Sequence, residues 1–344
     1  MQTPTVICLT PVFNEKWILE RFLQCASLWA DHIVIADQGS TDGSRDIAAR
    51  FPKVTLLNNS SQAYNEVSRQ QLLLEAARKI PGPRVLIALD SDEFLTANVL
   101  TSPEWNTIRH AAPGTVIRFQ WPEILCDESG LRYFNFPWDP PMGFVDDGSE
   151  HAGKVLHSDR LPVPPGAETL LPKEIKVMHY CQTDPDRYQS RSRWYQCWEL
   201  LNQKRRPLDL FRFYNRDQCV SADVVKPVPA DWIAAYQERD VDMTSVWRES
   251  SYRWDKEVLK FFAEHGTKKF KRLDIWKPDW NALHRQIDPA GANVSYESPR
   301  SWFDRIVHRW LRRTQQYFAH YGAPGLWRQF YLHFVEKVLR WIGW

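Results

Sequence analysis

The sequence has no apolar stretch that approaches the length needed to cross a bilayer, and its first residues lack the charged and apolar regions of a signal peptide. The net charge is only +2, which argues against a general nucleic-acid binder. There is also no internal repeat and no low-complexity tract. We therefore expect a globular chain that neither spans a membrane nor binds nucleic acid.

The cysteines are few and irregularly placed. None of the six has the spacing of a metal or redox motif, so a reducing cytoplasm is the simplest compartment. They are Cys8, Cys25, Cys126, Cys181, Cys197 and Cys219. With 344 residues, 43% of them hydrophobic, the chain can fill one large core or two modest ones.

The most informative feature is a short apolar run that ends at a cluster of carboxylates. Residues 85–89 are all apolar, and Asp90, Asp92 and Glu93 follow. Such a run is typical of a strand buried on both faces, and open α/β sheets bind ligands at the carboxyl ends of their strands. Carboxylates this close repel one another unless a cation lies among them, and their oxygens suit Mg²⁺ or Mn²⁺ and hence a diphosphate. A solvated acidic turn is the alternative.

Strand and helix patterns alternate through the amino-terminal third. Helical spacing of apolar residues separates the apolar runs, and one predicted helix covers residues 64–80. Strands are predicted at residues 6–9, 32–36, 54–57 and 85–89. This alternation predicts a mostly parallel sheet joined by right-handed crossovers.

In four segments the chain resembles the family 2 glycosyltransferases, which bind nucleotide sugars. These segments occur in the family's order and at about its spacing: residues 10–15, 37–42, 68–69 and the Asp-x-Asp motif at 90–93. The resemblance covers roughly the first hundred residues and then thins to a few positions near His179. It implies a fold of the GT-A type, which is α/β with a mostly parallel, Rossmann-like sheet flanked by helices.

The resemblance also implies which residues bind the donor. The nucleoside would be held by residues of the first two segments: Thr10, Pro11, Val12, Asn14, Glu15 and Asp37. Arg69 would face the diphosphate or brace the acidic cluster. Asp90 and Ser91 would contact the nucleotide, and Asp90 and Asp92 would hold Mg²⁺ or Mn²⁺. We expect a nucleoside-diphosphate sugar as the donor, with a UDP-sugar as the specific prediction.

Elementary chemistry leaves some of these residues a second interpretation. A carboxylate at a strand end, such as Asp37, can accept hydrogen bonds from a nucleoside, but it can also cap the next helix. Asp42 opens a helix, so satisfying free backbone N–H groups is its expected role. Arg69 suits a phosphate or the acidic cluster, and a surface arginine is the alternative.

Later segments are expected to complete the site. Residues 134–166 are rich in Pro, Gly and Asp, and a segment of this kind predicts an acceptor pocket, with an ordered surface excursion as the alternative. Related transferases place a late His-Tyr pair where the imidazole completes the metal site or touches the diphosphate, which nominates His179; a structural histidine is the alternative. Residues 188–194 resemble a segment of processive members, but the spacing is one residue too long to imply processivity.

Direct displacement with inversion at the anomeric carbon needs a carboxylate that takes the acceptor's proton. Five carboxylates are candidates: Asp146, Asp147, Glu150, Glu168 and Glu174. Relatives of the lipopolysaccharide-core type place a Glu before the late His-Tyr pair, which favours Glu168, with Asp147 next. This chain lacks the His that precedes the Glu in those relatives.

The carboxyl-terminal part predicts helices. Residues 240–280 have aromatic anchors at Trp247, Trp254, Phe261 and Phe262. Two amphipathic stripes follow: Trp302, Phe303, Ile306, Val307, Trp310, Leu311 and Phe318, then Leu326, Trp327, Phe330, Tyr331, Phe334, Val335, Val338, Leu339 and Ile342. Residues 299–344 have eight Arg or Lys and two acids, which favours helices at a membrane surface. A hairpin packed on the enzyme or on a second subunit is the alternative, so an oligomer stays open.

These features together predict a metal-dependent glycosyltransferase of polysaccharide biosynthesis, peripheral at the cytoplasmic face of a membrane, with a glycan or glycolipid acceptor. We predict a catalytic domain at 1–200, with a nucleotide half at 1–100 and an acceptor half at 101–200. A helical extension at 201–298 and amphipathic helices at 299–344 would follow. The alternatives are an aspartyl phosphoryl-transfer enzyme and a non-catalytic membrane-surface binding protein on a transferase scaffold.

Overall fold

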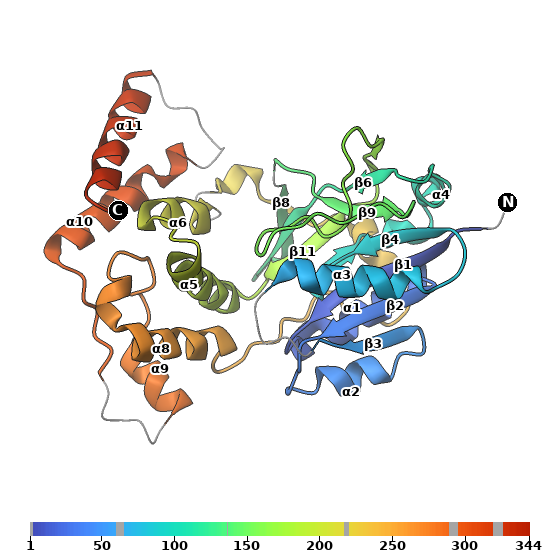
Figure 1. The fold of residues 1–344 in the computed structure, drawn as a ribbon, viewed down its shortest axis with the longest axis horizontal. Coiled ribbons are helices and arrows are strands. Elements are labelled where there is room, and N and C mark those ends of the chain that lie inside the picture. Colours follow the sequence, from blue (N-terminus) through green and yellow to red (C-terminus); the bar gives the residue numbers. More distant parts are fainter. Residues whose placement is uncertain (1–2, 60–64, 136, 217–219, 289–294, 319–325) are drawn as a thin grey trace. The chain divides into compact units, whose positions relative to one another are not determined.

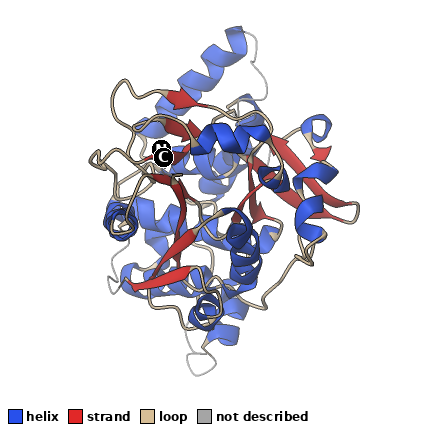
Figure 2. Cartoon of the chain, turned by 90° about the vertical axis from the view of Figure 1, so that its right-hand side faces the viewer, coloured by secondary structure: helices blue, strands red, loops and turns tan. Residues whose placement is uncertain are grey.

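The computed structural model describes residues 3–59, 65–135, 137–216, 220–288, 295–318 and 326–344, without the side chains of 326–328. The chain divides into two compact units. The first contains Met1–Thr183 and Lys226–Trp247, and the second contains Asp184–Val225 and Arg248–Trp344. The strands among the described residues all belong to the first unit, whereas every regular element described in the second is helical (strands red and helices blue in Figure 2). The domain boundaries predicted at residues 200 and 298 stay a prediction.

The first unit alternates strands and helices along its amino-terminal half (Figure 1). Its strands are β1 (Thr5–Val12), β2 (His32–Asp37), β3 (Val54–Asn58), β4 (Arg84–Ala88), β5 (Glu93–Leu95), β6 (Val116–Arg118), β7 (Pro122–Asp127), β8 (Gly130–Asn135), β9 (Pro141–Val145), β10 (Thr169–Leu170), β11 (Val177–Gln182) and β12 (Lys226–Pro227). Its helices are α1 (Lys16–Trp29), α2 (Ser44–Ala49), α3 (Glu66–Arg78), α4 (Pro103–Arg109) and α7 (Ala234–Gln237), with 3₁₀ turns η1 (Ala97–Leu100) and η4 (Ala230–Trp232). The four strands predicted at the start of the chain are present.

The predicted fold class is confirmed by the large sheet, whose strand order is β10-β6-β9-β4-β1-β2-β3. β1 pairs in parallel with β2 and β4, and β2 pairs in parallel with β3. The exception is β9, which runs antiparallel between β4 and β6. The sheet is therefore mostly parallel, and its first strands end at one common edge.

Helices cover both faces of this sheet because successive strand residues point to opposite sides (Figure 1). Val6 and Cys8 of β1 belong to a core with α1, whereas Ile7 and Leu9 belong to a second core with α3. A strand buried on both faces must be apolar at every position, as the runs in this sequence are. α3 begins at Glu66 after the Asn65 cap, whose side chain accepts a hydrogen bond from the amide of Ser68. The helix start predicted at Tyr64 lies outside the described residues.

A second sheet has the strand order β12-β8-β7-β11-β5, and its edge strand β5 begins at the acidic cluster. β5 continues the chain from that cluster and pairs with β11, which also pairs with β7. Phe94 of β5 packs edge-on against Tyr180 of β11, and both belong to the α1 core. The second sheet therefore places the predicted His179 strand beside the end of β4.

The second unit is built from helices joined by buried charges. They are α5 (Pro185–Asn202), α6 (Pro207–Tyr214), α8 (Arg253–His265), α9 (Trp280–Ile287), α10 (Trp302–Thr314) and α11 (Leu326–Trp341), with 3₁₀ turns η3 (Ala222–Val224), η5 (Thr267–Phe270) and η7 (Gln315–Tyr317). Arg193 of α5 forms an ion pair with Asp255 of α8 at 2.8 Å, and both side chains are nearly buried. Arg212 of α6 forms an ion pair with Glu336 of α11 at 2.9 Å.

The helical prediction for residues 240–280 holds only in part. No helix covers 240–252, where Asp242 accepts hydrogen bonds from the amides of Thr244 and Ser245 and so stabilises a turn. The predicted anchor Trp247 is 62% exposed, whereas Trp254 is buried. The local side-chain acceptor therefore overrides the apolar spacing in that stretch.

The amphipathic helices at the carboxyl end bury one face and expose another. Val307 and Leu311 of α10 and Leu339 of α11 share a small core with Leu208 and Phe211 of α6. One face of each helix is therefore packed in the core of the second unit, and the predicted hairpin stays a prediction; the side chains of Leu326 and Trp327 lie outside the described residues. Among the described helices, none has the length and apolar character needed to span a membrane.

Candidate active site

The donor-binding segments predicted from sequence meet at one edge of the large sheet. The register pairs Val12 with Asp37 and Leu9 with Ala88, so β1, β2 and β4 end side by side. Because these strands are parallel, the loop after β1, Asp37 and the acidic cluster after β4 lie at the same carboxyl edge. This is the edge at which open α/β sheets bind ligands.

Burial separates the five residues nominated in the first loop. Thr10 and Val12 are buried in β1, whereas Pro11, Asn14 and Glu15 are half-buried. Thr10 and Val12 therefore pack inside the protein and support the loop from within β1. Direct contact with a ligand is open to the three half-buried residues.

Hydrogen bonds between the loops after β1 and β2 fix their shape. The amide of Thr41 donates to Asn14 Oδ1 at 2.8 Å. Asp42 accepts from the amide of Lys16 at 2.9 Å and from the hydroxyl of Ser44 at 2.7 Å. Burial opposes ionisation of Asp42, but these hydrogen bonds outweigh it and lower the pKa of its carboxyl. Asp42 thus satisfies backbone N–H groups, as the sequence predicts.

Asp37 is buried at the start of the second loop and has several partners. Arg45 Nη1 lies 2.5 Å from Asp37 Oδ2, and the amides of Gly39 and Ser40 donate to the same carboxylate at 3.1 and 3.2 Å. Gly39 has a φ of 79°, a conformation that side chains with a Cβ rarely adopt. The carboxylate braces the turn, and its role toward a nucleoside stays a prediction.

The acidic cluster contains a cation that the sequence did not identify, Arg160. Its guanidinium bonds Asp90 Oδ2 at 2.9 Å and both oxygens of Glu93, one of them at 2.9 Å. Glu93 is fully buried and also accepts from the amide of Asp90 at 2.7 Å. Ser91 and Asp92 are buried as well, while the Asp90 side chain is 43% exposed. Asp90 is therefore the carboxylate of this cluster most accessible to a nucleotide.

Electrostatics support this internal ion pair. Burial raises the pKa of Glu93 and neighbouring Asp90 raises it further, while Arg160 opposes both. Burial alone would lower the pKa of Arg160, but Asp90 and Glu93 raise it, so the guanidinium stays charged. A charged Arg160 among these acids removes much of the repulsion that the sequence alone implied.

His179 stands at the centre of three neighbouring strands. The register places it opposite Glu93 of β5 and Glu123 of β7. Its Nδ1 lies 3.0 Å from Glu123 Oε1, and its Nε2 lies 3.7 Å from Asp92 Oδ2. The structure therefore brings together two of the three predicted metal ligands, Asp92 and His179.

The surroundings of His179 fix its ring. Trp121 stacks on it with centroids 4.5 Å apart, and Cys181 Sγ lies 3.4 Å from Nδ1. Burial alone would lower the pKa of His179, but Cys181, Glu123 and Asp92 together raise it well above its ordinary value. These partners hold the imidazole in one orientation, with Nε2 toward Asp92.

Two possible donor sets share this histidine. Donor atoms of Glu123, His179 and Cys181 all lie within 4.8 Å of one another, and sulfur with nitrogen is a set that suits Zn²⁺. Asp92 and His179 instead supply a carboxylate oxygen and an imidazole nitrogen, which suit Mn²⁺ better. Cys181 Sγ donates to Glu123 Oε2 at 3.0 Å, so the thiol and this carboxylate are already paired. The donor chemistry fits Asp92 and His179 as ligands, with Glu123 orienting the ring from behind.

The two carboxylates nominated as the base, Asp147 and Glu168, are not brought to this edge. β9 runs antiparallel to β4 and pairs Val145 with Val85, so Asp147 lies beyond the amino end of β4. Glu168 precedes β10, and its carbonyl accepts a hydrogen bond from the amide of Val116 at 2.8 Å. The strand register places Glu168 level with the amino end of β4. Asp90 lies beyond the opposite end of β4. Asp146, beside Asp147, is bound to Arg78 and Arg84 at 2.8 and 2.9 Å.

The segment before β9 does reach the site. Trp138 is 52% exposed and packs edge-on against Trp121 at 6.1 Å, and Trp121 stacks on His179. Asp139 follows and is half-buried. An exposed indole beside a half-buried carboxylate provides a stacking surface and a hydrogen-bond acceptor. Part of the stretch predicted as an acceptor pocket is therefore linked to His179 through Trp121, and the pocket itself stays a prediction.

Sequence reasoning missed Arg160, Arg45, Glu123 and Cys181. The sequence held only a weak signal for one of these residues. Cys181 lies two positions after His179 on a strand, so the two side chains share a face. Arg69 is half-buried on α3, and its proposed role toward a diphosphate stays a prediction.

Comparison with known proteins finds a family model that matches the start of the chain. Residues 7–102 match the model of the glycosyl transferase family 2. This confirms the resemblance inferred from the motifs, and the matched residues run from within β1 to just beyond β5. The match covers less than half of the chain and ends before His179. A sequence comparison with curated proteins found no match.

Several solved structures are similar to parts of the chain. Glucosyl-3-phosphoglycerate synthase from Mycobacterium tuberculosis is 14% identical over 34% of this chain, with a TM-score of 0.26. The chain spans only 44% of the length of that protein. A glycosyltransferase involved in glycosylation of the major capsid of PBCV-1 is 13% identical over 54% of this chain and 97% of its own, with a TM-score of 0.28. A 4-diphosphocytidyl-2C-methyl-D-erythritol synthase is 15% identical over 50% of this chain and 89% of its own, with a TM-score of 0.28.

Proposed function

We propose that this chain transfers a sugar from a nucleoside-diphosphate sugar, with a UDP-sugar as the specific prediction, to a hydroxyl of a glycan or glycolipid. One observation supports this most directly. The strands and loops of the family 2 domain converge on Asp37, Asp90 and Asp92, and His179, from outside the matched segment, lies 3.7 Å from Asp92. A carboxylate and an imidazole at the ligand-binding edge of an open α/β sheet can hold a divalent cation for such a reaction.

The donor is proposed to lie along the carboxyl edge of β1, β2 and β4. The rigid loops after β1 and β2 present Asn14 and Glu15 beside Asp37, where they can hold the nucleoside. Asp90 is exposed and held by Arg160, so its free oxygen can accept from ribose hydroxyls. Arg69 remains the proposed partner of the diphosphate.

Asp92 and His179 are proposed to hold Mg²⁺ or Mn²⁺. When bound, the cation supplies positive charge against the departing diphosphate. Glu123 orients the His179 ring, because its carboxylate binds Nδ1 and leaves Nε2 toward Asp92. Trp121 covers one ring face and limits water at the site.

The acceptor is proposed to lie against Trp138, with Asp139 as the base. An indole with half its surface exposed can stack on a sugar ring. A carboxylate on that side can take the proton of the attacking hydroxyl as it displaces the diphosphate, which inverts the anomeric carbon. Asp147 and Glu168 face the opposite edge of the sheet, so Asp139 replaces them in this proposal.

Acceptor class and site of action remain as proposed from sequence. A glycolipid or surface-polysaccharide precursor at the cytoplasmic face of a membrane fits the exposed aromatic side chains of α10 and α11. The protein would then be peripheral rather than embedded.

A thermal-shift screen tests the donor proposal without knowledge of the acceptor. Nucleoside diphosphates and nucleotide sugars would be compared with and without Mn²⁺, since a ligand of the folded state raises the melting temperature by mass action. We expect one nucleoside diphosphate to stabilise the protein, and to do so more strongly with Mn²⁺. No stabilisation by any nucleotide at millimolar concentration would refute the proposal.

A further inference from the structure

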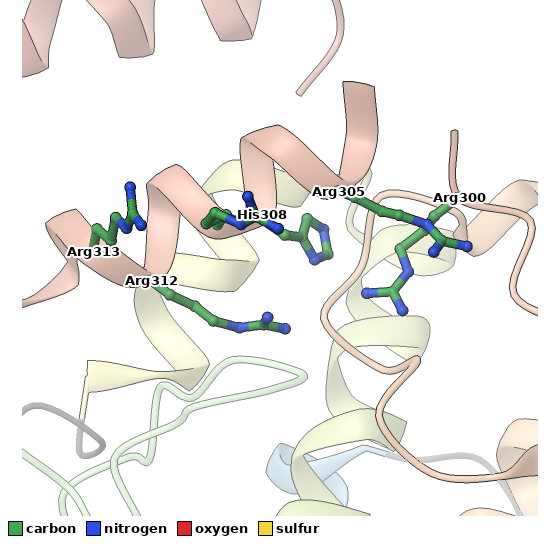
Figure 3. Close-up of a pocket in the computed structure, with 6 residues that line it drawn as sticks. Arg300, Arg305, His308, Arg312 and Arg313 are labelled. Carbon is green, nitrogen blue, oxygen red and sulfur yellow. The ribbon is translucent and has the colours of Figure 1, made fainter. Parts of the chain in front are cut away.

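A cavity lined almost wholly by cationic side chains lies along α10 in the second unit. Its volume is about 320 Å³. Figure 3 shows these side chains along one stretch of the helix, with Arg300 coming from the segment before it. The lining residues are Arg300, Arg305, His308, Arg309, Arg312 and Arg313.

Few acids neutralise this cavity. Asp274 is bound to Arg312 at 2.6 Å and lies 3.4 Å from His308 Nδ1. Within the described part of the chain, Arg305, Arg309 and Arg313 form no ion pair. Burial lowers the pKa of Arg300; Asp274 and Asp304 oppose this, but the neighbouring Arg305 and Arg312 add to it, and the pKa stays below its ordinary value. The cavity therefore holds an excess of positive charge that a phosphate group would neutralise, because planar guanidinium groups bind phosphate oxygens in pairs.

The same helix face also carries exposed apolar groups. Trp302 and Ile306 are 74 and 50% exposed, and Arg309 and Arg313 continue the same stripe at helical spacing. Their positions differ by four, three and four residues, so all four point to one side of α10. The opposite side, with Val307 and Leu311, is packed against α6.

α11 presents an exposed aromatic stripe that its own packing leaves uncovered. Phe330, Phe334 and Trp341 are 76, 63 and 87% exposed, and Val338 between them is 43% exposed. The other side of the helix, with Leu339, lies in the core shared with α6. Such a set of exposed aromatic side chains marks an interaction surface rather than scattered surface residues.

We propose that α10 and α11 form a docking site for an anionic phospholipid surface, in which headgroup phosphates enter the arginine cavity and the aromatic side chains enter the acyl interface. Charge complementarity decides the occupant. A second copy of this chain would bring two arginine clusters together, whereas anionic lipid neutralises them and accommodates Trp and Phe at the same depth. This inference rests on the proposed placement of the protein at a membrane surface, and it uses no residue of the proposed donor site.

Vesicle binding by the full-length protein tests this proposal. Sedimentation with vesicles of phosphatidylglycerol and phosphatidylcholine would be compared with pure phosphatidylcholine, over a range of salt. We expect binding to the anionic vesicles only, and weaker binding as salt rises. Equal binding to both vesicle types, or none to the anionic ones at low salt, would overturn the proposal.

Paired variants locate the site. Arg309→Gln with Arg313→Gln should weaken vesicle binding by roughly 10- to 30-fold, and Phe330→Ser with Trp341→Ser should also weaken it. The matched control, Lys268→Gln with Lys269→Gln, removes two exposed charges elsewhere in the same unit and should change little. Equal losses in the arginine pair and the lysine pair would show non-specific attraction and contradict the proposal.

Two further measurements separate other occupants. Inorganic phosphate at millimolar concentration and constant ionic strength should not displace the protein from the anionic vesicles; full displacement would make this a soluble-anion site instead. Light scattering should show the same mass for the wild type and the Phe330→Ser, Trp341→Ser variant, and a dimer lost in the variant would assign the stripe to self-association. The thermal shift with nucleotide should be the same in all variants, so that a failure here is distinct from a failure of the proposed transfer reaction.

Discussion

At the scale of single residues, the candidate site depends on how one imidazole is held. His179 can present Nε2 to a cation only while Nδ1 is engaged, and Glu123 engages it at 3.0 Å. Carboxylates behind metal-bound histidines usually act in this way. Glu123 is therefore as important to the proposed metal site as the ligands themselves, although no motif marks it.

Replacing Glu123 tests this role. Glu123→Gln should lower the affinity for Mn²⁺ by roughly 10- to 100-fold while the fold stays intact. Titration of Mn²⁺ followed by electron paramagnetic resonance measures the affinity directly. Cys181→Ala is the matched control and should change the affinity little. A larger loss in Cys181→Ala than in Glu123→Gln would assign the metal to the sulfur-containing set instead.

The proposed base gives a second prediction at this scale. Asp139→Asn should lower kcat by roughly 100-fold or more and leave donor affinity unchanged, because general-base catalysis acts in the transition state. Asp147→Asn and Glu168→Gln each remove one negative charge at the opposite edge of the sheet, as Asp139→Asn does at the site, and they serve as controls. If either control lowers kcat while Asp139→Asn does not, the base assignment is wrong.

At the scale of elements, β4, α3 and β9 are joined by one buried carboxylate. Asp146 follows β9 and binds Arg78 of α3 and Arg84 of β4, and its side chain has no exposed surface. Burial opposes ionisation, but the hydrogen bonds from Arg78, Gly148 and Arg84 lower the pKa of Asp146 below its ordinary value. The ion pairs therefore stabilise the sheet while Asp146 is ionised.

Removing this charge should destabilise the protein. Asp146→Asn should reduce the free energy of unfolding near neutral pH by about 3 kcal/mol, because two partly buried guanidinium groups lose their partner. A carboxyl whose pKa is lowered in the folded protein stabilises the folded state at pH values above its unfolded-state pKa of about 3.9. This stabilisation is lost as the pH falls through the folded-state pKa. Urea unfolding measures the free energy of unfolding of wild type and variant, and the difference between the two values should therefore shrink below about pH 4. A difference that is constant from pH 7 to pH 3 would contradict this account.

Arg212 has the corresponding role between α6, α10 and α11. It binds Glu336 at 2.9 Å, the carbonyl of Leu311 at 2.9 Å and the hydroxyl of Thr314 at 2.8 Å. Arg212→Ala should reduce the free energy of unfolding of the second unit by about 3 kcal/mol, since Glu336 stays buried with fewer partners. Tryptophan fluorescence during denaturation measures this free energy, and Lys256→Ala, at an exposed residue, is the control. An effect no larger than that of the control would show that these helices are held by apolar packing alone.

Elements were predictable from sequence where one rule decided them. The apolar runs of β1, β2 and β4 are buried on both faces, so their pattern alone indicated a parallel sheet with its polar ends at one edge. By contrast, Arg160 reaches Asp90 through an irregular loop, and no periodicity reports where such a loop returns. Pairing across β5, β11 and β7 likewise brings Glu123 to His179 from a distant part of the sequence.

At the scale of the whole molecule, the two units carry separate proposals. The first contains the segment similar to family 2 glycosyl transferases and the Asp92–His179 pair, and the second contains the arginine cavity and the exposed aromatic stripe. The amphipathic pattern after Pro299 left two interpretations open because periodicity does not tell which apolar face is covered. The structure shows a packed face and an exposed face on the same helices.

The central claim is that Asp92 and His179 hold a divalent cation that strengthens nucleotide binding. Calorimetry of UDP binding to the wild type and to Asp92→Asn, each in Mn²⁺ and in EDTA, tests it most directly. We predict at least tenfold tighter binding in Mn²⁺ for the wild type and no difference between Mn²⁺ and EDTA for the variant. Equal affinity of the wild type in Mn²⁺ and EDTA, or an undiminished effect of Mn²⁺ in Asp92→Asn, would contradict the account.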